Sequence, residues 1–151
     1  MDKKECRSWH EIAPQRQMNG AQLDEFLAQS DECIFTQGAC HVMAAALYQE
    51  FKRKGASVHV YEALCGGAFK HYLVGRTGLG YTDVQLRWEP PESFDFREVN
   101  LGQFTHLARA LGNGPCCIES DFLAATEKRA TSFIAKHALR IDQMAAEAKV
   151  G

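Results

Sequence analysis

The 151-residue chain lacks the features that mark several large classes of protein. Its longest apolar stretches, such as Val42–Tyr48, fall far short of the ~20 residues that a membrane-spanning helix needs. The basic residues near the start are not followed by the apolar core of a signal peptide. Positive charge is not in excess, since 17 Lys and Arg face 19 Asp and Glu and give a formal net charge of -2. These absences predict a cytoplasmic protein that neither enters a membrane nor binds nucleic acid through a general positive field.

The composition itself is that of an ordinary globular domain. Hydrophobic residues make up 46% and charged residues 24%, which excludes disordered, collagen-like and coiled-coil chains. There are six cysteines, of which Cys116 and Cys117 are adjacent. A chain of this length has no need of disulfide staples, and nothing marks it for export. We therefore expect the cysteines to be free thiols.

Apolar periodicity predicts a mixture of helices and strands, which is an α+β fold. Helical spacing covers 21–29, 40–54, 101–111 and the long tail 120–150, and β-rich segments cover 58–64, 68–76 and 81–86. The helix at 40–54 is the clearest, because it ends on Lys52, Arg53 and Lys54 and is followed by Gly55. Three consecutive alanines in this helix leave little side chain between it and its neighbours. We expect it to be central and buried.

The chain divides by these patterns into an N-terminal arm at 1–20, a core at 21–115 and a C-terminal helix at 116–151. The tail carries one apolar stripe of period 3.6: Phe122, Thr126, Ala130, Phe133, His137, Ile141, Met144 and Ala148. Such a stripe needs an apolar partner. We expect the half up to Ile134 to dock on its own chain and the rest to be freer or shared, which makes this helix the candidate surface for a homo-oligomer.

Cys40 has the setting of a reactive thiol. It follows Gly38 and Ala39 at the first turn of the clearest helix, where unsatisfied N–H groups and the positive end of the helix dipole lower a cysteine pKa. The N–H of Cys40 also offers a donor for an oxyanion. A nucleophile placed there still requires a base.

His71 and Asp83 are the predicted partners of Cys40. If the hairpin between 68–76 and 81–86 turns symmetrically about Thr77, His71 and Asp83 lie opposite each other on one face. A carboxylate there would orient the imidazole and stabilise its charged form. His59 is the alternative base if the register differs. His41, whose side chain should point away from that of its neighbour Cys40, is expected at the surface or behind the reacting groups.

The ordered set Cys40, His71, Asp83, with the surrounding segments 38–47 and 81–84, resembles the papain-like and transglutaminase-like cysteine hydrolases. The resemblance spans 34–86 and implies a nucleophilic cysteine at the N-terminus of a central helix, packed on an antiparallel sheet, here with a C-terminal helical extension. The sequence departs from the family pattern at two positions. His41 stands where many members have an aromatic residue, and Gln37, the tentative oxyanion donor, is only three residues ahead of the cysteine.

The resemblance implies a cysteine hydrolase or acyl-transferase that acts on amide bonds of a protein or peptide through a thioester. Peptidase (thiol protease), deamidase and transglutaminase chemistry all remain open, and none of them requires a cofactor or a metal. Two other functions also remain. The same fold can serve as a non-catalytic module that docks a protein partner through its C-terminal helix. A zinc site built from Cys65, Cys116 and Cys117 with His41 or His71 is disfavoured, because no C-x-x-C pair is present.

Overall fold

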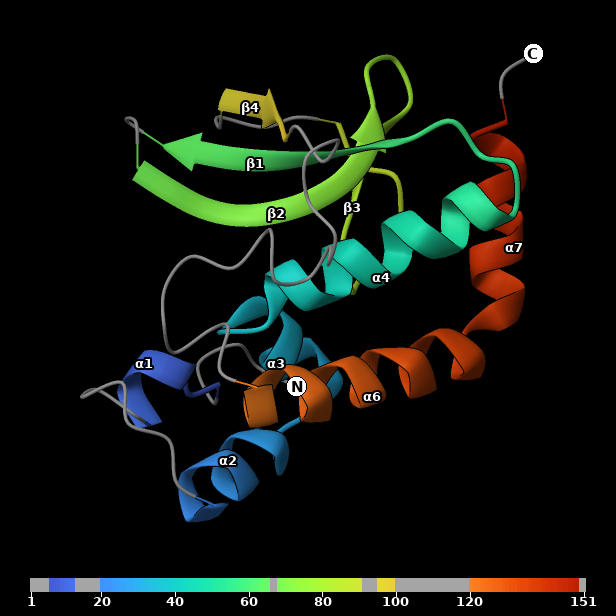
Figure 1. The fold of residues 1–151 in the computed structure, drawn as a ribbon. Helices are drawn as coiled ribbons and strands as arrows, with labels where there is room; N and C mark the ends of the chain where they lie inside the picture. The colour runs from blue at the N-terminus through green and yellow to red at the C-terminus, as the bar shows by residue number, and fades with distance from the viewer. Residues whose placement is uncertain (1–5, 13–19, 66–67, 91–94, 100–119, 150–151) are drawn as a thin grey trace.

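The computed structural model describes residues 6–12, 20–65, 68–90, 95–99 and 120–149. Over these residues the chain forms an antiparallel sheet stacked on a layer of helices, so the predicted α+β class is confirmed (Figure 1). Helix α4 (Cys40–Arg53) lies between the sheet and helix α6 (Ser120–Lys136). The central position expected for the alanine-containing helix is therefore observed.

Helix α4 agrees closely with its prediction. It ends with Lys54 as C-cap and with Gly55 at a φ of 84°, a left-handed conformation that favours glycine. Val42, Met43, Leu47 and Phe51 are almost completely buried, as are the alanines at 44 and 45. The small side chains let β2 and α6 approach α4 from two sides.

Short helices precede α4. They are α1 (Trp9–Ile12), α2 (Gly20–Leu27) and α3 (Asp31–Thr36). Helix α3 falls where the sequence pattern breaks and was not predicted. Ser30 nevertheless caps it, since its hydroxyl accepts a hydrogen bond from the N–H of Cys33 at 3.3 Å. The cap and the acidic first turn were the available signals for a helix too short to show periodicity.

A disulfide between Cys6 and Cys33 ties the N-terminal arm to α3. The prediction that all cysteines are thiols is therefore wrong for this pair. It rested on chain length and on the missing export signal, whereas pairing depends on the arm folding back until the two Cα atoms lie 5.2 Å apart. Spacing along the sequence does not reveal that approach. Cys40 remains a free thiol.

The sheet has the strand order β3-β2-β1-β4. Its strands are β1 (His59–Cys65), β2 (Ala68–Arg76), β3 (Gly80–Thr82) and β4 (Asp95–Glu98). The first two match the predicted strands at 58–64 and 68–76. The strand predicted at 81–86 is wrong beyond Thr82, where the chain leaves the sheet.

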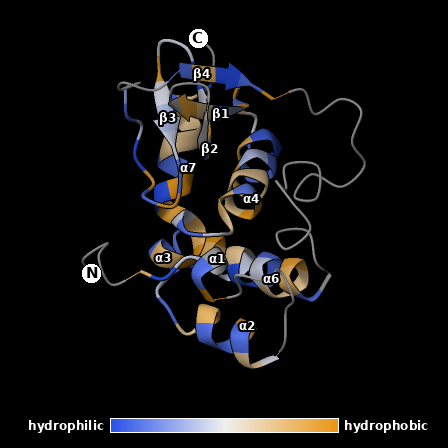
Figure 2. Ribbon diagram, turned by 90° about the vertical axis from the view of Figure 1, so that its left-hand side faces the viewer, coloured by the Kyte–Doolittle hydropathy of each residue, from blue (hydrophilic) through white to orange (hydrophobic). Residues whose placement is uncertain are grey.

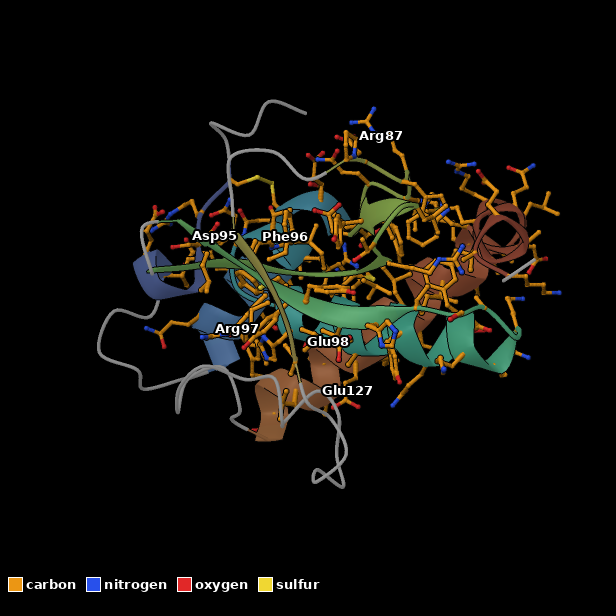
Figure 3. The ribbon with its side chains drawn as sticks, turned by 90° about the horizontal axis from the view of Figure 1, so that it is seen from above. Arg87, Asp95, Phe96, Arg97, Glu98 and Glu127 are labelled. Carbon is orange, nitrogen blue, oxygen red and sulfur yellow. A yellow bond between two sulfur atoms is a disulfide. The ribbon has the colours of Figure 1, made fainter. Side chains whose placement is uncertain are left out.

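Strand β4 was not predicted, because it lies in the segment 87–100, where the adjacent prolines at 90 and 91 are typical of a loop. It is a short edge strand with charged side chains along its length (Figure 3). Arg97 donates a hydrogen bond to Glu62 Oε1 on β1 at 2.6 Å. Charged residues on a short edge protect it from pairing with another chain.

The β2–β3 hairpin turns about Gly78 rather than about Thr77. Gly75 pairs with Tyr81 and Arg76 with Gly80, and the turn glycine has a φ of 91°. A Cβ atom on Gly75 would lie 2.2 Å from the carbonyl oxygen of Gly80. The expected register was therefore wrong by two residues, because the glycines allow the turn to close one position later. A shift of two leaves each side chain on its face.

The C-terminal tail is divided at His137 into α6 and α7 (Ala138–Glu147). In α7, Ile141 and Met144 are fully buried. Arg140 Nε donates to the carbonyl of Leu86 at 2.9 Å, and the carbonyl of Ala148 accepts hydrogen bonds from the N–H of Ser57 and from the Arg76 guanidinium, both at 3.0 Å. The expectation of a freer second half is therefore wrong, since the break at His137 turns α7 back against its own core (Figure 1).

The apolar faces of the helices meet inside the molecule (Figure 2). The tail stripe is buried along both α6 and α7 apart from His137, whose ring packs on Phe133 with centroids 4.4 Å apart. The helix predicted at 101–111 and the junction at 116–119 lie outside the described residues. Among the helices that the structure describes, none has both the length and the apolar character needed to cross a membrane.

Candidate active site

Cys40 is the first residue of α4, as predicted. Ala39 is the N-cap and provides no side-chain acceptor, so no side chain of the cap occupies the N–H groups of the first turn. The N–H of Ala39 itself donates to the carbonyl of Ile34 at 3.0 Å, which fixes the approach of α3 to α4. The thiol thus stands at the positive end of a 14-residue helix dipole.

His71 lies on β2 directly after an irregularity in the β1–β2 pairing. His71 pairs with Ala63, whereas Phe69 pairs with Leu64, so one extra residue stands on the β2 side between them. This arrangement is a β-bulge, which bends a strand and changes the direction of nearby side chains. The local sequence gave no sign of it.

Asp83 follows the last residue of β3 and makes the predicted contact with His71. Its Oδ2 lies 2.9 Å from His71 Nε2, and its Oδ1 accepts a hydrogen bond from the N–H of Gln85 at 2.9 Å. An ionised carboxylate only accepts hydrogen bonds, so Nε2 is the donor and Nδ1 is left for another partner. The pairing was predicted on the wrong register. The turn after β3, in which Arg87 N–H donates to Thr82 Oγ1 at 3.0 Å, brings the carboxylate to the imidazole instead.

The pKa values of the thiol and the imidazole move in opposite directions. Burial raises the pKa of Cys40, but hydrogen bonds from His41 and His71 and their positive charge outweigh it and lower the pKa to about 6. Burial lowers the pKa of His71, but the hydrogen bonds to Asp83 and Cys40 and their negative charge raise it to about 9. Between these two values the stable form is a thiolate beside an imidazolium.

His41 contributes to the site, although the sequence argument expected it at the surface or behind the reacting groups. It is only 3% exposed, and its ring stacks on Phe122 of α6 with centroids 6.5 Å apart and planes inclined by 11°. The surface expectation was wrong because α6 covers this residue. Consecutive Cα atoms are only ~3.8 Å apart, so an imidazole can reach its neighbour's sulfur although the Cβ directions diverge.

The remaining predicted residues have other positions. His59, the alternative base, lies on β1 with its Nδ1 3.3 Å from Glu98 Oε1, and about half of its side chain is exposed. It takes no part in the contacts of Cys40. Gln37 is the C-cap of α3, half-buried, and its N–H donates to the carbonyl of Cys33. Its assignment as an oxyanion donor stays a prediction.

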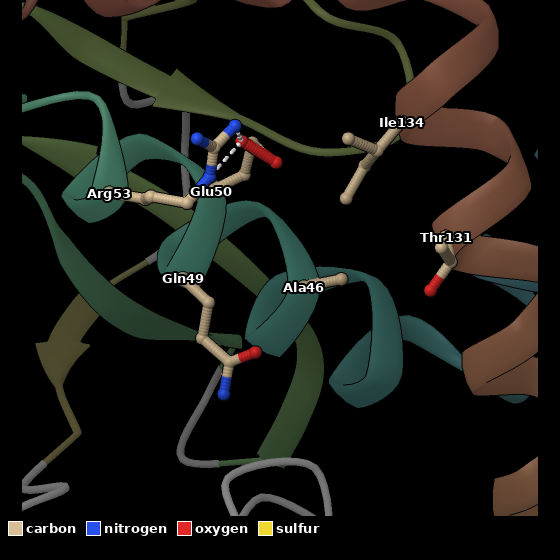
Figure 4. A pocket seen from close by; sticks show the side chains of 6 residues that line it. All are labelled: Ala46, Gln49, Glu50, Arg53, Thr131 and Ile134. Carbon is tan, nitrogen blue, oxygen red and sulfur yellow. Dashed lines mark hydrogen bonds and ion pairs between the residues drawn. The ribbon is translucent and has the colours of Figure 1, made fainter.

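A groove of about 270 Å³ between α4 and α6 is separate from these residues (Figure 4). It is lined by Ala46, Gln49, Glu50, Arg53, Thr131 and Ile134. Arg53 Nε donates to Glu50 Oε1 at 2.8 Å across one wall. With its charged groups paired and its lining mixed, this groove offers no reactive side chain.

No cluster of three or more metal-ligating side chains occurs within the described part of the chain. Cys116 and Cys117 of the alternative zinc set lie outside it. What the geometry brings together is therefore a helix-terminal thiol, an imidazole and a carboxylate, with a second imidazole beside the thiol. In comparisons with known proteins, no family model, no curated protein and no solved structure matches this chain.

Proposed function

We propose that this protein is a cysteine hydrolase or acyl-transferase that acts on amide bonds of a protein or peptide substrate. The observation that carries the proposal is the pairing of Cys40, with its pKa lowered to about 6, and His71, with its pKa raised to about 9 by Asp83 among other groups. Strongly perturbed pKa values cluster at functional sites, and a thiol with a lowered pKa beside an imidazole is the arrangement that activates a cysteine nucleophile.

The chemistry follows from the charges of the pair. The Cys40 thiolate attacks the carbonyl carbon and the carbonyl electrons move to oxygen, near the N–H of Cys40 in the first turn of α4. When the tetrahedral species collapses, the C–N bond breaks and the His71 imidazolium gives its proton to the departing amine. A thioester is left on Cys40. Water or a second amine, deprotonated by the now neutral His71, then releases the acyl group and the thiolate.

Asp83 holds the ring of His71 in one tautomer throughout. Its carboxylate takes the Nε2 hydrogen bond, which leaves Nδ1 for the sulfur and for the leaving amine. The order Cys, His, Asp and the helix packed on an antiparallel sheet support a papain-like or transglutaminase-like core. Hydrolysis, deamidation and transamidation share the same thioester, so the proposal covers all three.

The Cys6–Cys33 disulfide is informative about the compartment in which the protein lies. Cytosolic reductants keep most thiols reduced, whereas disulfides persist in oxidising environments. The Cys6–Cys33 bond therefore weighs against the cytoplasmic location that the sequence predicts and favours an oxidising compartment.

Selective alkylation tests the proposal. At pH 7, iodoacetamide should modify Cys40 faster than any other thiol, as read by peptide mass spectrometry, because its thiolate is already formed. His71→Ala should abolish this selectivity, and the matched variant His59→Ala, which removes an exposed imidazole on the next strand, should preserve it. A panel of fluorogenic peptide amides should then be cleaved by the wild type and not by Cys40→Ala. Equal labelling of every thiol, or equal cleavage by Cys40→Ala, would contradict the proposal.

A further inference from the structure

The second imidazole at the thiol has no role in the mechanism above. His41 follows Cys40 in the first turn of α4, and its hydrogen bond lowers the pKa of Cys40 more than any other interaction of the thiol. His71 is shared between Cys40 and Asp83, whereas His41 reaches the sulfur from the helix that carries it.

Packing fixes the ring of His41. Helix α6 presents Phe122, fully buried, against the imidazole in a nearly parallel stack with an 11° inclination between the planes. Phe122 is held in turn by Phe26 of α2, whose ring centroid lies 5.8 Å away. A side chain locked between helices loses little further entropy when it makes a hydrogen bond.

From this geometry we propose that His41 is a positioning residue: its ring N–H donates a hydrogen bond to the Cys40 sulfur and holds it as a thiolate, while His71 carries the proton. This role of His41 rests on the proposed function, because a stable thiolate serves catalysis. Its test does not, because it measures only the reactivity of the Cys40 thiol. The titratable groups that act on the thiol are His41 on its own helix and His71 on β2, with Asp83 behind the latter.

The division of labour has a chemical reason. During turnover His71 gives its proton to the leaving amine and regains one from water or the second amine, so its hydrogen bond to the sulfur is interrupted in each cycle. A donor that takes no part in this proton transfer holds the thiolate in the resting site and, together with the reprotonated His71, when the sulfur departs in the last step. His41 is suited to this because burial beneath Phe122 keeps competing water from its ring.

The experiment measures the pH dependence of Cys40 alkylation by iodoacetamide in the full-length protein. The wild type should show a midpoint at about pH 6. His41→Phe keeps a ring on Phe122 but removes the donor, and its midpoint should rise by about one pH unit or more, because hydrogen bonds to charged groups are among the strongest. His41→Asn retains an N–H donor and should recover part of the shift. Phe122→Leu retains His41 but loses the stack, and should raise the midpoint by less than His41→Phe.

Each outcome decides the matter. A midpoint that stays at the wild-type value in His41→Phe overturns the proposal, as does an equal rise in His41→Phe and His41→Asn, which would point to packing alone. If His41→Phe does not fold by circular dichroism, the comparison of Phe122→Leu with the wild type decides in its place, and an unchanged midpoint there overturns the proposal. Alkylation needs no turnover. A protein without amide hydrolysis but with the expected shift would refute the proposed function and leave the role of His41 standing.

Discussion

Replacing Asp83 with Asn measures the effect of the carboxylate charge separately from the rest of the site. The amide has nearly the same shape and its oxygen can still accept the hydrogen bond from His71 Nε2, so the change removes chiefly the negative charge. The two side chains are 19% and 20% exposed, which screens their interaction only in part.

The size of the effect follows from the pKa of His71. It lies about 2.5 pH units above its ordinary value of 6.5, a difference that corresponds to roughly 3 kcal/mol in favour of the imidazolium. The bond to Asp83 is the largest of the contributions that raise this pKa, ahead of Cys40, and burial opposes both. Without the carboxylate charge we expect the pKa of His71 to fall by about one pH unit or more.

Proton NMR of the His71 ring against pH is the direct assay. The alkaline limb of amide hydrolysis should move down with the NMR midpoint, because it reports loss of the His71 proton. Asp24→Asn is the matched control, since it removes an exposed carboxylate on α2 and should leave His71 titrating at about 9. A His71 midpoint in Asp83→Asn that equals that of the wild type would refute the assignment of Asp83 as its orienting partner.

Other perturbations have equally definite outcomes. Amide hydrolysis by the wild type should be bell-shaped, rising through about pH 6 and falling through about pH 9, and a flat profile would contradict the ion pair. Cys6→Ser should lower the free energy of unfolding in urea by about 3.5 kcal/mol, which is the loop entropy for a separation of 27 residues. Dithiothreitol should then cause no further loss, and a free energy of unfolding equal to that of the wild type would argue against the disulfide. Ile141→Ala should cost about 2–5 kcal/mol, whereas Leu139→Ala, at a side chain 81% exposed, should change stability by less than about 0.5 kcal/mol; equal effects would contradict the docking of α7. Gly75→Ala should lower the melting temperature, because its Cβ would overlap the Gly80 carbonyl, and an unchanged melting temperature would show that the hairpin is looser than described.

Local signals were enough to predict the elements that carry the nucleophile and the base. The helix from Cys40 has a long amphipathic period, cations in its last turn and a terminal glycine, and strand β2 has its predicted bounds. Short elements escaped because periodicity needs length. Helix α3 spans six residues, fewer than two helical turns, and strand β4 spans four residues, only two repeats of the strand alternation.

The contact between His71 and Asp83 was predicted correctly, but partly by coincidence. His71 and Asp83 do meet, but by a turn after β3 rather than by direct opposition across the hairpin. The sequence could not show which side chains are covered or paired by residues far away along the chain. Burial of His41 depends on Phe122, more than 80 positions away along the chain, and the Cys6–Cys33 bond depends on the path of the N-terminal arm.

The attachment of α7 has a consequence for how the chain folds during synthesis. Two places near the sheet, Ser57 just before β1 and Leu86 after β3, form hydrogen bonds with residues that are translated about 90 and 54 positions later, Ala148 and Arg140. At about 5–20 residues per second, the helix that completes them leaves the ribosome several seconds after the sheet residues do. For that interval the apolar surface that Ile141 and Met144 will cover stays open, so the chain is most exposed to aggregation before α7 docks.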